Sequence, residues 1–297
     1  MKAIYELVAP AKLNLFLHVV GRRPDGYHLL QSAFVLIDWC DVLHVERRDD
    51  GLLRRHDLGA ALPSDDLCLR AARALQAESG TGFGADISID KQIPWGAGMG
   101  GGSSDAAATL LALNRLWKLN WPLPRLLDLG LKLGADVPFF LAGRNAWVEG
   151  IGEKLTPLDL PPQRFAVVKP AAHIATQAIF QSPLLVRDTE AVILAGFLAD
   201  VGSGVGIDKL VQGFGRNDLQ PAAQASCDEV AQAARLLEDR FGNSRMTGSG
   251  SAVFARMHEI DGTDSQPLAT LPELPAGWVG RMCRSLQQHP LSGWAAD

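Results

Sequence analysis

The clearest chemical pattern of the sequence is a glycine-rich segment, Gly96-Ala97-Gly98-Met99-Gly100-Gly101-Gly102-Ser103-Ser104. It follows an alternating apolar run that Pro94 ends, and it precedes a largely apolar stretch that starts at Ala106. A loop between a strand and a helix N-terminus gathers unpaired N–H groups and the positive end of the helix dipole, which favour an anion. Glycines allow positive φ and a close approach of the backbone amides. The segment therefore predicts a phosphate-binding loop, with a flexible turn as the alternative.

Two other phosphate motifs fit this segment less well. Gly96, Gly98 and Gly101 satisfy the GxGxxG pattern of dinucleotide-binding domains, but the acidic residue expected about 20 positions later is missing near Trp121-Pro122. Gly96 and Gly101 also have the P-loop separation, but Gly102-Ser103 follows them in place of lysine and a hydroxyl residue. A triphosphate site would therefore take its lysine from another segment, and a dinucleotide-dependent enzyme is kept as an alternative function.

Lys12 is a candidate for that lysine. It lies in an otherwise apolar run together with Asn14, which shares its face of a strand. A charge there needs a partner, and the carboxylate we favour is Asp136, in Leu133-Gly134-Ala135-Asp136-Val137-Pro138. Each residue has a structural alternative, because a lysine can protect a strand edge from aggregation and an aspartate can cap the turn that follows it.

The elements that position these residues are predicted from periodicity and caps. We expect strands at 33–38, 41–46, 85–93 and 165–168, and helices at 66–78, after Ser103-Ser104-Asp105, at 123–133 and at 221–241. Asp66 should cap the first helix and Gly80 should end it, whereas Ser103, Ser104 and Asp105 should cap the second. The glycines of 199–208 predict a surface loop.

Composition and length favour a globular protein of about two domains. The chain has 297 residues, of which 47% are hydrophobic and 21% charged, and prolines near 157–162 mark a junction between residues 1–160 and 161–297. With 33 acidic and 28 basic residues the net charge is −5, which opposes diffuse binding to nucleic acid or membrane surfaces. Four scattered cysteines, apolar runs too short to cross a bilayer and no recognisable signal peptide predict a cytoplasmic protein with a small-molecule partner.

Three segments resemble the ordered motifs of the GHMP-type small-molecule kinases: Pro10-Ala11-Lys12-Leu13-Asn14, Pro94 to Ser104, and Thr247-Gly248-Ser249-Gly250-Ser251. Further segments resemble the branch of this family that acts on a cytidylated methylerythritol in the non-mevalonate isoprenoid pathway: Lys12 to Leu17, Asp25-Gly26-Tyr27-His28, Leu133 to Phe139 and Gly150-Ile151-Gly152-Glu153. The likeness is dense over 8–180 and looser over 217–255. It implies two α+β domains with the active site in the cleft between them.

The resemblance also implies the reaction and its residues. ATP would be the phosphoryl donor, with Mg²⁺, and the 2-hydroxyl of the cytidylated polyol would be the acceptor. Asp136 would accept the hydroxyl proton, Lys12 would orient it, and Tyr27 and Phe180 would stack on the cytosine. The implied ATP contacts are Pro94, Gly96, Gly98, Gly100, Gly101, Gly102, Ser103 and Ser104, and the implied substrate contacts are Asn14, Tyr27, His28, Thr176 and Phe180. A GHMP-type kinase with a mevalonate-like or homoserine-like substrate is the alternative.

Two positions depart from the family's pattern, and one metal ligand is predicted. Asp66 stands where related kinases often carry Asn near the adenine, and Gln177 follows Thr176 where the family has Pro. Ser104 is the candidate for Mg²⁺, because a hydroxyl at the end of a phosphate cradle commonly faces the ion, although it could instead cap the helix. We further expect residues 247–251 to lie beside the first glycine loop.

Overall fold

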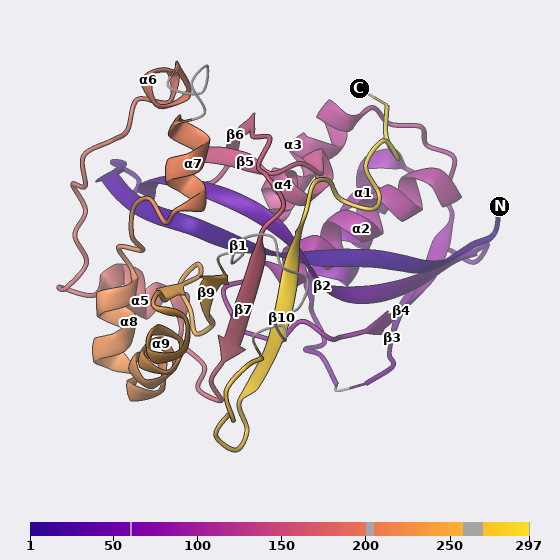
Figure 1. The fold of residues 1–297 in the computed structure, drawn as a ribbon. Helices are drawn as coiled ribbons and strands as arrows, with labels where there is room; N and C mark the ends of the chain where they lie inside the picture. Colours follow the sequence, from indigo (N-terminus) through magenta and orange to yellow (C-terminus); the bar gives the residue numbers. More distant parts are fainter. Residues whose placement is uncertain (60, 200–204, 258–269, 297) are drawn as a thin grey trace.

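Two long antiparallel strands, β1 (Ala3–Arg22) and β2 (His28–Arg48), form the frame of the fold in the computed structural model, which describes residues 1–59, 61–199, 205–257 and 270–296 (Figure 1). Their pairing runs from Ala3 opposite Glu46 to Arg22 opposite His28. β2 also pairs with β4 (Gly84–Asp90), β5 (Ala146–Gly150) and β10 (Val279–Leu286). Through β2, strands from both halves of the chain join a single ten-stranded sheet of the described residues.

The remaining strands extend this sheet in both directions. Their order is β3-β4-β2-β10-β7-β9-β8, with β1 and β5 also on β2 and β6 on β5. Only β3 and β4 pair in parallel, and the other ladders are antiparallel. The bounds are β3 (Leu53–Asp57), β4 (Gly84–Asp90), β5 (Ala146–Gly150), β6 (Lys154–Pro157), β7 (Arg164–Lys169), β8 (Arg245–Met246), β9 (Val253–Met257) and β10 (Val279–Leu286).

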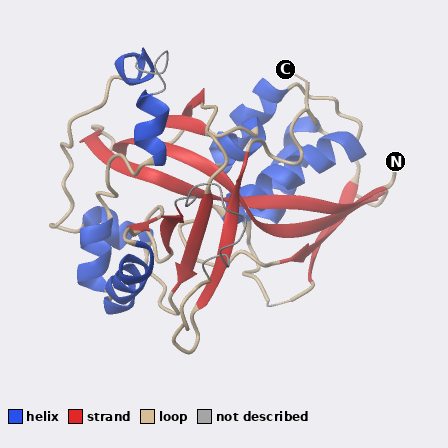
Figure 2. Cartoon of the chain, viewed as in Figure 1, coloured by secondary structure: helices blue, strands red, loops and turns tan. Residues whose placement is uncertain are grey.

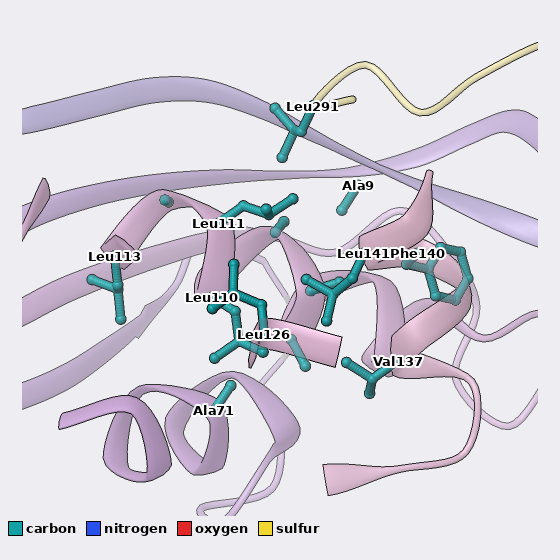
Figure 3. Close-up of a cluster of buried hydrophobic side chains, with 14 of the residues drawn as sticks. Ala9, Ala71, Leu110, Leu111, Leu113, Leu126, Val137, Phe140, Leu141 and Leu291 are labelled. Carbon is teal, nitrogen blue, oxygen red and sulfur yellow. The ribbon is translucent and has the colours of Figure 1, made fainter. Parts of the chain in front are cut away.

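Four helices pack against the part of β1 and β2 that lies near the N-terminus (Figure 1). They are α1 (Leu67–Ser79), α2 (Gly101–Leu116), α3 (Leu123–Leu133) and α4 (Val137–Ala142). α2 is buried almost all round, and Figure 3 shows its Leu110, Leu111 and Leu113 in one cluster with Ala71, Leu126 and Leu141. Because α2 is fixed in this core, its N-terminal end, where the glycine loop joins it, has little freedom to move.

A second group of helices packs on the strands of the C-terminal half (Figure 2). The helices of this half are α5 (Thr176–Gln181), α6 (Leu194–Ala199), α7 (Val205–Val211), α8 (Gln220–Ser226) and α9 (Asp228–Phe241). α5, α8 and α9 share an apolar core with Leu17 and Val19 of β1 and with β7 and β9. The fold is therefore α+β, as the sequence predicted, and the domain boundary near residue 160 stays a prediction.

Two strand predictions were wrong in detail. Residues 33–38 and 41–46 belong to one continuous strand instead of two separated by a break at Trp39-Cys40, because a shift of register between Pro10 and Ala11 absorbs Asp38-Trp39 as a bulge and Cys40 pairs with Pro10. The strand predicted at 85–93 ends at Asp90, since the backbone N–H groups of Gln92 and Ile93 donate to Asp41 Oδ1 instead of to a strand.

The helix predictions were correct for α1 and α3 and need correction elsewhere. Gly100 occupies the N-cap of α2 with φ +71°, so Ser103, Ser104 and Asp105 lie inside the helix and do not cap it. The helix predicted at 221–241 is interrupted at Cys227, whose extended backbone separates α8 from α9. Of the surface loop predicted at 199–208, residues 205–208 form the start of α7 and 200–204 lie outside the described residues.

Within the described part of the chain, none of the helices is both long and apolar enough to span a membrane.

His289 fastens the segment after β10 to the end of α4. Its N–H donates to the carbonyl of Gly143 at 2.8 Å, and its Nδ1 accepts from the N–H of Leu291 at 3.0 Å. The side chain is 1% exposed, and its Nε2 has no hydrogen-bond partner among the described residues. Burial lowers the pKa of His289 to about 4.

This histidine should make the fold sensitive to acid. Between pH 6.5 and 4 the unfolded chain binds the proton that the folded chain excludes, so acidification should lower the free energy of unfolding by up to about 3 kcal/mol through this group. The free energy of unfolding, measured by urea denaturation at several pH values, should fall less steeply with acidification in His289→Asn than in the wild type. Equal slopes for the two proteins would contradict the assignment.

Candidate active site

The Lys12 ammonium lies buried at the centre of β1, where side chains of several elements meet. Its Nζ donates to Asn14 Oδ1 at 2.7 Å, lies 3.4 Å from Asp136 Oδ2 and sits 4.2 Å above the ring of Phe34. The side chain of Lys12 is only 4% exposed, whereas that of Asp136 is 30% exposed. Asp136 stands at the N-cap of α4 but makes no side-chain capping bond, so its carboxylate stays directed at Lys12 and the adjoining cavity.

Asn14 connects this pair to a distant segment. Its Oδ1 accepts from Lys12 Nζ, from the N–H of Gly248 at 2.9 Å and from Thr247 Oγ1 at 3.2 Å, while its Nδ2 donates to Ser32 Oγ at 3.0 Å. Asn14 is 1% exposed and lines the larger of two cavities. Through these bonds Asn14 positions Lys12 and the turn at 247–251.

The two glycine segments pack backbone against backbone. The N–H groups of Ser251 and Ala252 donate to the carbonyls of Gly96 and Ala97, both at 3.1 Å, and the N–H of Lys12 donates to the carbonyl of Met99 at 2.9 Å. The expected placement of 247–251 beside the first glycine loop is therefore confirmed. A Cβ on Gly98, which has φ +73°, would lie 2.3 Å from the Thr247 carbonyl oxygen. Only glycine fits there.

Two cavities open on either side of the first glycine loop. The larger, of about 990 Å³, is lined by both predicted catalytic residues and by all five predicted substrate contacts, Asn14, Tyr27, His28, Thr176 and Phe180. The smaller, of about 580 Å³, is lined by seven of the eight predicted ATP contacts, Pro94, Gly96, Gly98, Gly100, Gly101, Gly102 and Ser103. Gly98, Gly100, Ser103 and Thr176 line both cavities, so the two meet at these residues.

Ser104 is the predicted contact that lies apart from both cavities. It is fully buried, and its Oγ has no hydrogen-bond partner among the described residues. Ser103, one position earlier on α2, faces both cavities instead. Asp66 caps α1 as predicted, because its Oδ1 accepts from the N–H of Leu69 at 3.0 Å, and its Oδ2 lies 3.1 Å from Arg55. Asp66 also lines the smaller cavity.

A buried cluster of three charged residues holds both ends of the first glycine loop. Lys91 Nζ, before the loop, donates to Asp41 Oδ2 and to Asp105 Oδ2, on α2 after the loop. Burial and the Asp41 charge raise the pKa of Asp105 well above its usual range despite Lys91. Burial alone would favour the neutral amine of Lys91, but the two carboxyl groups outweigh it and raise its pKa. Lys91 thus joins Asp41 to α2 and offsets acidic charge beneath the loop.

The far wall of the larger cavity is aromatic. Tyr27, between β1 and β2, is 61% exposed, and the rings of His28 and Phe180 lie 4.9 Å apart with a 31° tilt. Burial, then the charges of Arg187 and Arg22, lower the pKa of His28 below 6.5, so the ring is neutral at pH 7. A flat ligand group fits such a wall better than an aliphatic one.

Sequence reasoning missed several lining residues. Leu62, Pro63 and Trp95 give the smaller cavity an apolar side, and Arg22 and Arg187 give the larger one cationic groups. Trp95 lies inside the glycine-rich motif, where an aromatic residue could have been noticed. Arg187 stands in an irregular segment that carries no pattern.

The fold is that of the GHMP kinases. Residues 66–144 match the GHMP kinases N terminal domain, and residues 194–262 match the GHMP kinases C terminal domain. The chain is a small-molecule kinase, with ATP as its phosphoryl donor. The dinucleotide-dependent alternative does not apply, and the strand before the glycine loop, β4, lies in a mainly antiparallel sheet instead of a βαβ unit.

Individual relatives with high sequence identity show which branch of the GHMP kinases the chain belongs to. A 4-diphosphocytidyl-2-C-methyl-D-erythritol kinase of Methylibium petroleiphilum is 62% identical over 99% of both chains, and one of Paracidovorax citrulli is 57% identical over 100% of this chain and 99% of the relative. A crystal structure of a 4-(cytidine 5'-diphospho)-2C-methyl-D-erythritol kinase aligns with a TM-score of 0.71 at 35% identity, covering 86% of this chain and 90% of the other. The chain belongs to the 4-diphosphocytidyl-2-C-methyl-D-erythritol kinase family. A homoserine kinase of Cytophaga hutchinsonii shares the fold, with a TM-score of 0.66 at 16% identity over 97% and 96% of the chains.

The contact between the glycine segments generates a prediction. Gly98→Ala should lower the melting temperature and weaken ATP binding measured by calorimetry, because its Cβ would meet the Thr247 carbonyl and the 247–251 turn would have to move. Gly102→Ala is the matched control for folding, since Gly102 lies in α2 and its Cβ would be 3.5 Å from Leu67, an ordinary contact. An unchanged melting temperature and ATP affinity in Gly98→Ala would show that the close packing is unimportant.

Proposed function

We propose that this chain transfers the γ-phosphoryl group of ATP to the 2-hydroxyl of 4-diphosphocytidyl-2-C-methyl-D-erythritol, the compound in its relatives' names. The observation that carries the proposal is the meeting of two cavities at Gly98, Gly100, Ser103 and Thr176, beside the Lys12–Asp136 pair. Phosphoryl transfer depends mainly on positioning the two reactants and stabilising charge, and this junction supplies both.

Asp136 acts as the general base. Its partly exposed carboxylate takes the proton of the acceptor hydroxyl, the hydroxyl oxygen bonds to the γ-phosphorus, and the bond to the β-phosphate breaks to release ADP. Lys12, 3.4 Å from Asp136, holds the carboxylate in place and offsets negative charge at the reacting oxygens. Asn14 positions the ammonium group.

The nucleotide occupies the smaller cavity. Leu62, Pro63 and Trp95 provide apolar surface for the base, and the amides at the N-terminal end of α2 face the phosphates. The Asp41, Lys91 and Asp105 cluster beneath the loop supports this arrangement, because the hydrogen bonds of Lys91 fix the loop on both sides.

The acceptor occupies the larger cavity. A volume of about 990 Å³ is at the upper end of the range for ligand pockets, which suits a nucleotide-linked polyol better than mevalonate or homoserine. Tyr27, His28 and Phe180 suit a pyrimidine ring, and Arg22 suits the diphosphate.

Magnesium fits the junction as an ion held mainly by the nucleotide. The described residues contain no group of three or more His, Cys, Asp or Glu side chains that could hold a metal, and Mg²⁺ usually keeps waters and phosphate oxygens as ligands. The protein oxygen groups that would face the ion at the junction are the Ser103 hydroxyl and the Asp136 carboxylate. Ser104, the residue predicted for this position, is buried, and its side chain would have to turn out of the core to bind the ion. When bound, the ion would neutralise phosphate charge.

A coupled assay of ADP release tests the proposal. Turnover should appear with ATP and the cytidylated methylerythritol, and homoserine and mevalonate should give rates near the background. Equal turnover with homoserine or mevalonate would assign the chain to another GHMP-type substrate. ATP binding without turnover on any of the three alcohols would refute the reaction.

Asp136→Asn tests the base. Turnover should fall by about 10²–10⁴-fold, the usual effect of losing a general base, while ATP affinity should change little. Lys12→Ala should also lower turnover. Asp159→Asn is the matched control, because Asp159 is 90% exposed and pairs only with Arg144. If Asp136→Asn turns over at a rate near that of Asp159→Asn, another group is the base.

A further inference from the structure

Arg187 joins the separate pieces of the aromatic wall of the larger cavity. Its Nε donates to His28 Nε2 at 3.1 Å, and one terminal nitrogen donates to the carbonyl of Leu185 at 2.9 Å. The other terminal nitrogen donates to the carbonyls of Phe180 at 2.9 Å and Ser182 at 3.0 Å. These bonds use four of the five N–H donors of a guanidinium. One side chain thus fixes the end of α5 and the segment after it to the start of β2.

The bond to His28 also decides where the imidazole carries its proton. A guanidinium can only donate, so Nε2 of His28 must present a lone pair. Because the ring is neutral, its proton is then on Nδ1. Among the described residues no protein group accepts from Nδ1, and His28 lines the larger cavity. The ring therefore offers an N–H donor that the protein itself does not use.

The surroundings of His28 keep it in this state. Arg187 from the segment after α5 and Arg22 from the end of β1 both oppose its protonation, and burial adds to them. Asp25 and Tyr27 of the β1–β2 turn are the other ionisable groups of this wall, and the Asp25 carboxylate pairs with Arg23 at 2.7 Å. Phe180, whose carbonyl accepts from Arg187, lies against the ring of His28.

We propose that Arg187 is a positioning residue for the acceptor substrate, which holds the Phe180 and His28 rings as one wall and fixes His28 as an Nδ1–H donor toward a hydrogen-bond acceptor of the base. The inference rests on the proposed function for the identity of that base, cytosine, whose N3 and O2 are acceptors. The tautomer of His28 is independent of the proposed function, because it follows from the contacts of the protein alone.

The first test needs no substrate. In ¹⁵N NMR spectra of the ligand-free protein at pH 7, the His28 signal, assigned by its loss in His28→Gln, should show a protonated Nδ1 and an unprotonated Nε2. Arg187→Met should shift the tautomer population toward Nε2–H and raise the pKa of His28. Arg22→Met is the matched control, because it removes a nearby charge but leaves the Arg187 bond, so the tautomer should stay as in the wild type. Wild-type protein with the proton on Nε2 would overturn the proposal without any variant.

The second test measures kinetics. Arg187→Met should raise KM for the cytidylated methylerythritol by about tenfold or more, as expected for losing a charge-assisted hydrogen bond, with little change in KM for ATP. Equal increases in both KM values, or an unchanged substrate KM in a folded variant, would overturn the proposal. If the wild type does not turn over this substrate, the proposed function fails, while the NMR result still decides the role of Arg187.

Discussion

The buried ammonium of Lys12 is the constraint on which the site depends. A charge that is almost fully removed from water is tolerated only where neighbouring groups replace its hydration. Asn14, Asp136 and the ring of Phe34 do so here, and they come from β1, α4 and β2. The groups that replace the hydration of the Lys12 amine therefore bring Asp136, the candidate base, close to it and fix both residues to the sheet.

Asn14 extends the same constraint to the second half of the chain. Since its Oδ1 serves Lys12 and the N–H of Gly248 together, the 247–251 turn lies where the first glycine loop passes. The close contact of Gly98 with Thr247 then leaves room for backbone only. The wall between the two cavities is consequently thin at Gly98 and Gly100, which is what direct transfer between two bound ligands requires.

The charges of the site divide between its two sides. Beneath the glycine loop, Lys91 offsets the acidic charge of Asp41 and Asp105, and its hydrogen bonds fix the ends of the loop. Across the junction, Arg22 and Arg187 place positive charge around a neutral His28. Of the described residues that line the larger cavity, three are cationic, Lys12, Arg22 and Arg187, and two are carboxylates, Asp25 and Asp136, so the cavity favours an anionic ligand.

The sequence by itself determined the local elements and the residues with special chemistry. Asp66 and Gly80 set the ends of α1. The glycines from Gly96 to Gly102 indicated a segment whose backbone closely approaches another group. These features depend on near neighbours in the chain, so periodicity, caps and spacing are enough to find them. The order of the three motifs was also enough to indicate the kinase family.

Tertiary structure decided everything that depends on contacts between distant residues. Trp39-Cys40 reads as a break, but β2 continues through it because β1 pairs on both sides of a bulge at Asp38-Trp39. Ser103 and Ser104 are both predicted phosphate contacts, although only Ser103 faces the cavities. The orientation of α2 decides which serine faces the cavities, since the buried side of the helix determines which residues of its first turn are exposed. Arg187 carries no local pattern, and its partners lie on segments up to 159 positions away in the chain. Such groups are selected by the space and hydrogen-bonding partners of the folded chain, which no short stretch of sequence contains.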